Sequence, residues 1–164
     1  MVDLNELRSL AARVAASADL IDVRLFNLES TLEHVPASSG ELSYSFESEV
    51  EVQESENESA VLLVDGTYDV KLRQDADGSD DGDPDGGSPI AQVKIHLAAL
   101  YEIHEGESVD FTDEELDAFA KTTGLLALHP YARELISNLT SRMGLPTLHV
   151  GTVRIPLDKR NGDG

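Results

Sequence analysis

Apolar and polar residues alternate along four stretches of this chain, as in strands that bury one face and leave the other in water. The most regular stretch covers residues 41–53, where four glutamates share one parity with serine and glutamine. The opposite parity is apolar: Leu42, Tyr44, Phe46, Val50 and Val52. The same pattern predicts strands at about residues 59–73 and 89–104, and Gly66 marks a bulge or a close backbone approach.

The first predicted strand, residues 19–33, changes phase partway along. Its apolar residues are odd-numbered from position 21 to 25 and even-numbered afterwards: Ile21, Val23, Leu25, Phe26, Leu28 and Leu32. A shift of one residue indicates a β-bulge, or a strand that serves two packing surfaces.

Three other segments carry apolar residues at helical spacing. The first, residues 3–17, opens with a capping box at Asp3 and Glu6 and has a narrow apolar stripe. It is expected to dock on a sheet edge or on a partner's surface. The second opens with a capping box at Thr112 and Glu115 and is expected to end at Gly124.

The third helical segment carries the longest apolar stripe: Leu128, Tyr131, Ala132, Leu135, Ile136, Leu139 and Met143. Pro130 suits the first position of a helix, where no N–H is needed. Gly144 suits the left-handed residue after the last turn, and Pro146 prevents continuation. We therefore predict a rigid helix followed by an extended segment over residues 147–157.

Four antiparallel strands followed by two helices give an α+β layer fold. We expect an N-terminal helix over residues 1–18 and one main domain over residues 19–157. An acidic insertion at 75–88 and a tail at 158–164 are expected to be disordered. The apolar surface of the strands exceeds what the helices can cover, which favours self-association.

Composition narrows the classes of function. Of 164 residues, 32 are acidic and 12 basic, and the formal net charge is −20. This excess argues against direct nucleic-acid binding, because phosphate contacts need clustered Lys and Arg. Basic or unfolded polypeptides are compatible partners. The absence of cysteine excludes disulfides and thiolate metal sites, and no apolar run approaches the ~20 residues of a membrane span.

No catalytic or cofactor-binding motif emerges, so we predict a protein that is not an enzyme and that carries no cofactor or metal. The histidines lack the i, i+4 spacing of a helical zinc pair: His34, His96, His104, His129 and His149. The Asp-rich insertion matches half of an EF-hand loop from Asp77, but its last ligand position holds Ser88 instead of glutamate.

Several motifs resemble the SecB export-chaperone family. The core is Pro-Tyr-Ala-Arg-Glu at residues 130–134, followed by Ile-Ser at 136–137, Ser-Arg at 141–142 and Leu-Pro-Thr-Leu at 145–148. The first strand adds Arg-Leu-Phe at 24–26, and the fourth adds Ala-Leu-Tyr-Glu-Ile at 99–103.

Three further features are similar to the SecB-like chaperones of toxin–antitoxin–chaperone systems. They are the N-terminal helix, the acidic insertion before the fourth strand, and a Thr-x-Glu-Glu-Leu…Thr-Thr-Gly segment over residues 112–124.

The resemblance implies a four-stranded, Greek-key-like antiparallel sheet with the N-terminal helix and two C-terminal helices on one face. It implies a cytoplasmic, ATP-independent holdase that assembles as a homotetramer, a dimer of dimers. Its clients would be preproteins for export or an antitoxin, bound in apolar grooves. The residues by themselves also fit a non-catalytic regulatory module that binds one folded partner.

The resemblance also implies roles for individual residues. Client binding is expected at Leu42, Tyr44, Phe46, Leu25 and Phe26, for which plain core packing is the alternative. Oligomer contacts are expected at Leu135, Ile136, Leu139 and Met143.

A further expected partner is the motor SecA. Glu29 and Glu33 match part of the acidic patch with which SecB contacts SecA, but Lys94 stands where the family has an acid. The C-terminal helix of SecB is also missing here, which makes SecA docking doubtful.

Overall fold

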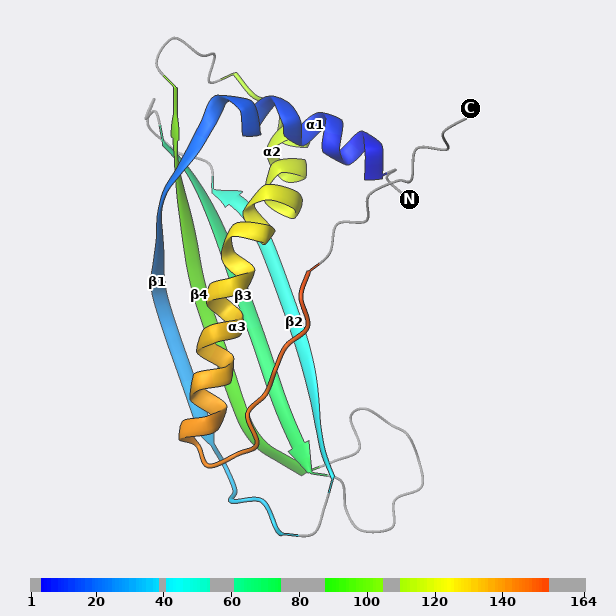
Figure 1. Ribbon diagram of the computed structural model, residues 1–164, viewed down its shortest axis with the longest axis vertical. Coiled ribbons are helices and arrows are strands. Elements are labelled where there is room, and N and C mark those ends of the chain that lie inside the picture. Colours follow the sequence, from blue (N-terminus) through cyan, green and yellow to red (C-terminus); the bar gives the residue numbers. More distant parts are fainter. Residues whose placement is uncertain (1–3, 39–40, 54–60, 75–87, 105–109, 154–164) are drawn as a thin grey trace, which may run out of the picture.

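The structure is a computed structural model that describes residues 4–38, 41–53, 61–74, 88–104 and 110–153. Its sheet has four antiparallel strands in the order β1-β4-β3-β2. The strands are β1 (Ala18–Leu32), β2 (Leu42–Gln53), β3 (Val61–Gln74) and β4 (Ser88–Ile103). The consecutive strands β2, β3 and β4 pair with one another, and β4 also pairs with β1, the first strand (Figure 1). This is a Greek key, so the predicted sheet is confirmed.

The change of phase in β1 reflects two bulges. The register with β4 shifts between Leu20 and Asp22 and again between Leu25 and Asn27, so Ile21 and Phe26 are the additional residues. The second bulge realigns the later leucines with the earlier ones. The result is a single apolar row facing the helices: Leu20, Val23, Leu25, Leu28 and Leu32. The predicted bulge is confirmed, and it keeps the row on one packing surface.

The C-terminal half forms one uninterrupted helical rod across one face of the sheet (Figure 1). It comprises α2 (Asp113–Phe119), a π-helical turn η1 (Ala120–Gly124) and α3 (Leu125–Arg142). The predicted end at Gly124 is therefore wrong, as is the predicted start at Pro130, which lies inside α3. The face of the sheet covered by this rod is called the inner face below.

Gly124 is needed for packing, not for ending a helix. Its backbone is right-handed helical, with φ −62° and ψ −47°. A Cβ atom there would lie 2.6 Å from Val64 Cγ1 on β3. Gly66 of β3 has a matching role, because a Cβ on it would lie 2.7 Å from Leu128 Cδ1. The predicted close approach at Gly66 is confirmed, and the two glycines let the helical rod and β3 approach each other closely.

The N-terminal helix α1 (Leu4–Ser17) docks on α2, so of the two predicted docking places, a sheet edge or a partner's surface, the sheet edge is wrong. Arg13 joins them: its guanidinium bonds both carboxylate oxygens of Glu115, at 3.1 and 2.9 Å, and stacks 5.4 Å from the Phe111 ring centre. Glu115 also accepts from the Thr112 N–H in the predicted capping box, which is confirmed. The Thr112 bond and then Arg13 lower the pKa of Glu115. The cap at Asp3 lies outside the described residues.

The core lies between the sheet and the helical rod. Its largest fully enclosed side chains include Phe119, Leu128 and Ile136 from the rod, with Tyr68 from β3. The rod ends as predicted: Gly144 has φ 74°, and the Leu145 N–H closes the last turn on the Thr140 carbonyl. Residues 145–153 then run back in extended form. Of the predicted insertion at 75–88, residues 75–87 lie outside the described residues and Ser88 begins β4. The predicted tail at 158–164 also lies outside them.

Candidate binding surfaces

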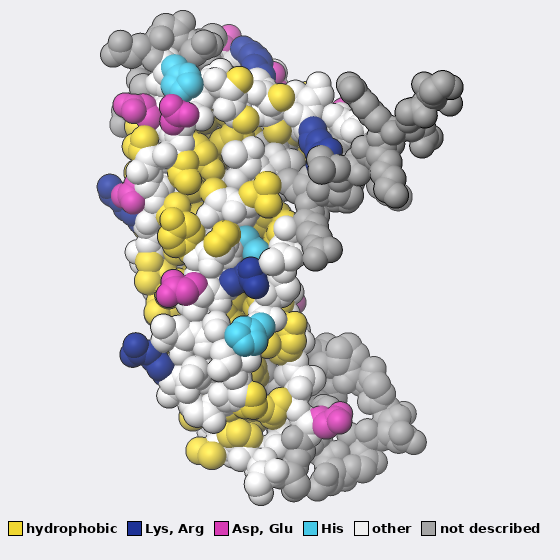
Figure 2. Space-filling model, in the orientation of Figure 1, with side chains coloured by type: hydrophobic (Ala, Val, Ile, Leu, Met, Phe, Trp, Pro, Cys, Tyr) yellow, Lys and Arg dark blue, Asp and Glu magenta, His cyan; other side chains and the backbone are white. Residues whose placement is uncertain are grey.

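A row of apolar side chains along β1 is uncovered. The rod packs over β3 and β4, so the inner face of the edge strand β1 extends beyond it (Figure 1). Leu20, Leu25, Leu28 and Leu32 are 37–48% exposed, although they face the same side as the core. Apolar side chains gather along this edge in Figure 2.

One flank of α3 borders this row. His129 marks the opposite flank, because it contacts Phe46 of β2 and the extended segment. Tyr131 lies two residues after His129, roughly 200° around the helix axis, and therefore faces β1. It is 48% exposed. We call Leu20, Leu25, Leu28, Leu32 and Tyr131 the β1 surface. Of these, only Leu25 was predicted as a site residue. The two bulges bring odd- and even-numbered residues of β1 to the same face, and simple alternation along the sequence does not show this.

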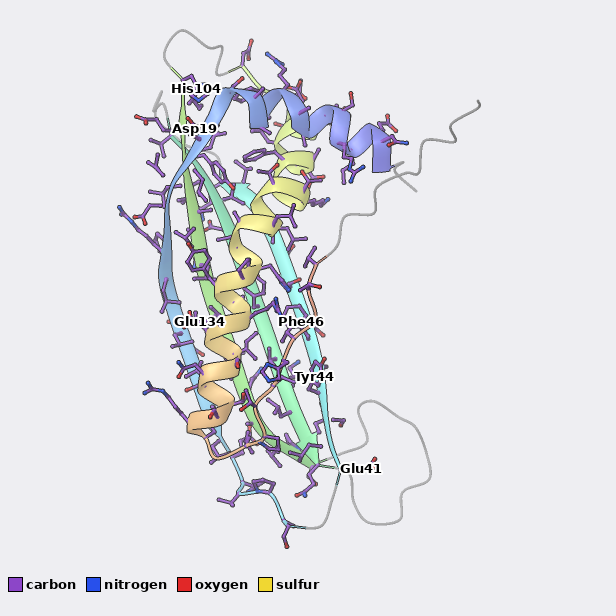
Figure 3. The ribbon with its side chains drawn as sticks, viewed as in Figure 1. Asp19, Glu41, Tyr44, Phe46, His104 and Glu134 are labelled. Atoms are coloured by element: carbon purple, nitrogen blue, oxygen red, sulfur yellow. The ribbon has the colours of Figure 1, made fainter. Side chains whose placement is uncertain are left out.

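A second apolar patch lies at the other edge of the sheet, on the inner face of β2. Leu42, Tyr44 and Phe46 alternate along it, and we call these three residues the β2 surface. Phe46 is half-buried, and its ring centre lies 6.1 Å from those of both Tyr68 and His129. Tyr44 follows the strand between Leu42 and Phe46 and is 48% exposed (Figure 3).

The five predicted client-binding residues therefore do not form one site. Leu42, Tyr44 and Phe46 lie together on β2, whereas Leu25 belongs to the β1 surface at the opposite edge. Phe26 is a bulge residue, 57% exposed, and it packs on His96 with the ring centres 5.4 Å apart. His96 lies on the outer face, away from the helices.

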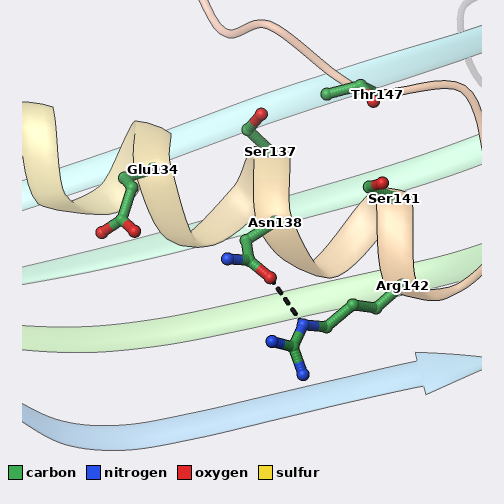
Figure 4. Close-up of a pocket in the computed structure, with 6 residues that line it drawn as sticks. All are labelled: Glu134, Ser137, Asn138, Ser141, Arg142 and Thr147. Atoms are coloured by element: carbon green, nitrogen blue, oxygen red, sulfur yellow. Dashed lines mark hydrogen bonds between the residues drawn. The ribbon is translucent and has the colours of Figure 1, made fainter.

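The four residues predicted to make oligomer contacts differ in how far they are buried. Ile136 is fully enclosed in the core of its own protomer and is unavailable to a second copy. Leu135, Leu139 and Met143 pack on the core and are partly exposed. From Glu134 onward the exposed residues of α3 are instead polar. A shallow cleft runs along it, lined by Glu134, Ser137, Asn138, Ser141, Arg142 and Thr147 (Figure 4).

The outer face of the sheet differs in charge between its edges. On β2 three successive outward residues are glutamates: Glu47, Glu49 and Glu51. On β1 the outward charges are one basic residue, Arg24, among the acids Asp19, Asp22 and Glu29, and Arg24 donates to Asp22 at 2.7 Å. Of the two predicted SecA contacts, Glu29 lies opposite Lys94 of β4. Glu33 follows the end of β1, where its N–H bonds the carbonyl of Ile90.

Two histidine–carboxylate pairs join strands on the described part of the chain. His96 Nε2 lies 2.9 Å from Asp65 Oδ1, and His104 Nε2 lies 2.9 Å from Asp19 Oδ2, joining the end of β4 to the start of β1 (Figure 3). No group of three metal-binding side chains occurs among the described residues. None of the described helices is long and apolar enough to span a membrane.

Comparisons with known proteins place this fold in a family. No protein-family model matches the sequence. The SecB-like chaperone MT2006 of Mycobacterium tuberculosis strain CDC 1551 is 33% identical over 157 residues, which cover 93% of this chain and 86% of that protein. The present chain is a member of the SecB-like chaperone family. SecB-like chaperone Rv1957 of M. tuberculosis strain H37Rv has the same identity and coverage.

The structural comparison agrees with this SecB-like assignment. The solved structure of Rv1957 holds a ChAD peptide from the Rv1956 HigA1 antitoxin. It matches with a TM-score of 0.75 and 30% identity, over 90% of this chain and 99% of that one. The resemblance seen in the sequence is therefore confirmed for family and fold.

Proposed function

We propose that this SecB-like chaperone is a non-catalytic holdase that keeps an unfolded polypeptide from aggregating without ATP. The observation that carries the proposal is the large area of exposed apolar side chain on one small, acidic domain. Among the described residues, ten large apolar side chains are 37–84% exposed: seven lie between Leu20 and Val35, and Tyr44 lies at the opposite edge of the sheet, on β2. Burial of apolar area is worth ~25 cal/mol per Å² and requires neither a sequence code nor a catalytic group.

We infer that the β2 surface binds the client. Tyr44 offers an exposed ring beside Phe46, and β2 is an edge strand to which an extended chain can add by backbone pairing. The outward glutamates of β2 would attract a basic client. The same glutamates disfavour pairing between two copies of β2, because antiparallel self-pairing would bring like charges together.

The β1 surface suits a second copy of this chain better. Its leucines follow an edge strand of 15 residues, long enough for isologous antiparallel pairing. The outward face of β1 includes Arg24 among the acids Asp19, Asp22 and Glu29, so an antiparallel partner can place a basic residue opposite an acidic one, which the glutamates of β2 cannot do. Leu25 is therefore assigned to assembly, and Leu135, Leu139 and Met143 are proposed to contribute from α3. A homotetramer built on this dimer remains our proposal for the assembly.

We propose an antitoxin as the dedicated client, and the cytoplasm as the place of action. A relative at 33% identity has a solved complex with an antitoxin peptide, which supports this choice over general export. Contact with SecA through Glu29 and Glu33 is less favoured, because Lys94 lies beside Glu29 and also pairs in register with Asp69. That arrangement interrupts a continuous acidic patch.

The holdase activity is tested by light scattering from a chemically denatured enzyme diluted into buffer without ATP. We expect suppressed aggregation at a small molar excess of the chaperone. Tyr44→Ser is expected to weaken this protection several-fold while leaving the melting temperature within a few degrees, since the side chain is half-exposed. Leu126→Ser is the matched control, because Leu126 is 46% exposed on α3.

Two outcomes would contradict the proposal. No protection by the wild-type protein at several-fold excess would rule out the holdase. Equal losses in Tyr44→Ser and Leu126→Ser would rule out the β2 surface as the client site.

A further inference from the structure

The extended segment after α3 lies along that helix on the side of β2. We call residues 145–153 the C-terminal strap. After Gly144 the chain reverses and follows α3 back toward its N-terminal end (Figure 1). Leu145 and Val150 are each only 5% exposed, and Leu148 is partly buried between them. Thr147, His149 and Gly151 are exposed. The strap thus presents side chains to the protein as an extended peptide ligand does.

The strap is held to α3 by side chains that contact its main chain. The Leu148 N–H donates to Thr140 Oγ1 at 3.0 Å. Arg133 Nε donates to the Val150 carbonyl at 2.7 Å, and His129 Nε2 lies 2.7 Å from the Gly151 carbonyl oxygen. Within the described part of the chain, no backbone–backbone hydrogen bond involves residues 146–153.

The three holding residues form one polar stripe on α3. His129, Arg133 and Thr140 are separated by four and seven residues, which places them on the same side of a helix. His129 and Thr140 are buried, at 4% and 0% exposure. Main-chain N–H and C=O groups occur in every polypeptide, so this stripe can bind an extended chain regardless of its side chains. It adjoins the β2 surface through the contact of Phe46 with His129.

We propose that the C-terminal strap is an intramolecular stand-in for a client, and that an unfolded polypeptide exchanges with it on the stripe of His129, Arg133 and Thr140. The proposal rests on the holdase function and names the site within it. A client that enters beside β2 takes over the main-chain contacts of the strap. Because the strap competes for the stripe, the observed affinity for a client is lower than the intrinsic affinity by the fraction of molecules in which the strap is released.

A cross-link that fixes the strap provides the first test. Ser137 and Thr147 line the same cleft, one on α3 and one on the strap, and neither belongs to the stripe. The chain has no native cysteine, so Ser137→Cys with Thr147→Cys can be joined cleanly by a short bismaleimide. The matched control is the same double variant with both thiols capped by N-ethylmaleimide. The probe is fluorescent, permanently unfolded, S-alkylated ribonuclease A, measured by anisotropy.

We expect the capped protein to bind the probe like the wild type and the cross-linked protein to bind at least tenfold more weakly. Equal affinity of the cross-linked and capped proteins would overturn strap exchange while leaving the holdase intact. Absence of probe binding by the wild type would overturn the holdase and, with it, the exchange.

A second variant is expected to raise the affinity for the probe, whereas the cross-link lowers it. Leu148→Ser weakens the packing of the strap and leaves the stripe unchanged, so we expect it to tighten probe binding several-fold. Weaker binding would mean that the strap is a fixed wall of the site and would overturn the proposal. Amide exchange at Leu148 is the parallel readout in the wild type: probe binding is expected to accelerate it, and unchanged or slower exchange counts against release.

Discussion

At the scale of single residues, two tyrosines of the central strands β3 and β4 are buried against the helical rod. Tyr68 and Tyr101 are 2% and 3% exposed, and neither hydroxyl has a hydrogen-bond partner among the described residues. Burial raises the pKa of each to about 12, because the phenolate loses its hydration inside the protein. An unfolded chain ionises its tyrosines near pH 10.

The two raised pKa values predict alkaline unfolding. Stabilisation from the neutral phenols is complete below about pH 10 and is lost as the pH rises toward about 12, because the unfolded chain gains by ionising first. Circular dichroism and phenolate absorbance, followed together against pH, should show the fold and the late-ionising tyrosines changing in step. Ionisation of all four tyrosines near pH 10 with the fold intact would contradict this prediction.

Tyr68→Phe should behave differently from wild type in that range. Removal of an unpaired hydroxyl is expected to change stability at neutral pH by no more than about 1 kcal/mol and to move the alkaline midpoint upward. Tyr44→Phe, at an exposed position, serves as the control and should leave the midpoint unchanged.

At the scale of elements, the sequence predicted strands better than helix ends. Alternation places each strand within two residues of its observed bounds. A strand with one solvated face shows this alternation in its own residues, so no distant contact is needed to locate it. Gly124 and Pro130 misled the helix prediction. The reason for Gly124 is the contact with Val64, a residue 60 positions earlier that local sequence cannot connect to it.

The contact between Gly124 and Val64 predicts that replacing a helical glycine with alanine lowers the stability of the protein, the opposite of the usual effect. Alanine is favoured over glycine by about 1 kcal/mol inside a helix, yet Gly124→Ala should lower the free energy of unfolding by about 1–2 kcal/mol. The new methyl would lie 2.6 Å from Val64 Cγ1, on a short buried side chain. Denaturant unfolding measures the difference, and the double variant with Val64→Ala should show a favourable coupling energy between the sites.

Gly151→Ala is the matched control for that experiment, because no atom of the described residues lies within 4 Å of a Cβ atom there. It should alter stability by no more than about 0.5 kcal/mol. A stabilising Gly124→Ala would show that helix propensity outweighs packing at this contact.

At the scale of the whole molecule, the fold leaves more apolar surface than one chain can cover. The sequence indicated this excess, but it could not assign the excess to edges of the sheet. The order β1-β4-β3-β2 puts Leu25 and Tyr44 at opposite edges, although their strands follow one another along the chain. Two separate surfaces allow one to be used for assembly while the other remains available for a client.

This separation predicts variants that lose assembly and keep client binding. Leu25→Asp with Leu28→Asp places two charges in the middle of the β1 surface, where each leucine would otherwise contribute about 1.5–3 kcal/mol on burial. In sedimentation velocity at micromolar concentration, we expect the wild type at about four times the mass of one chain and the variant at a smaller species. A wild-type monomer would contradict the assembly.

The β2 surface, which we propose binds the client, is the internal control for the same variant. Because Tyr44 and Phe46 lie at the far edge of the sheet, the dissociated variant should still bind unfolded ribonuclease A through β2, within a few-fold of the wild-type affinity per chain. The reciprocal variant Tyr44→Ser should stay assembled and lose that binding. If Leu25→Asp with Leu28→Asp stays assembled but loses the client, the roles of the two surfaces are reversed. The client then lies on β1, where the exposed leucines would give it the larger apolar area.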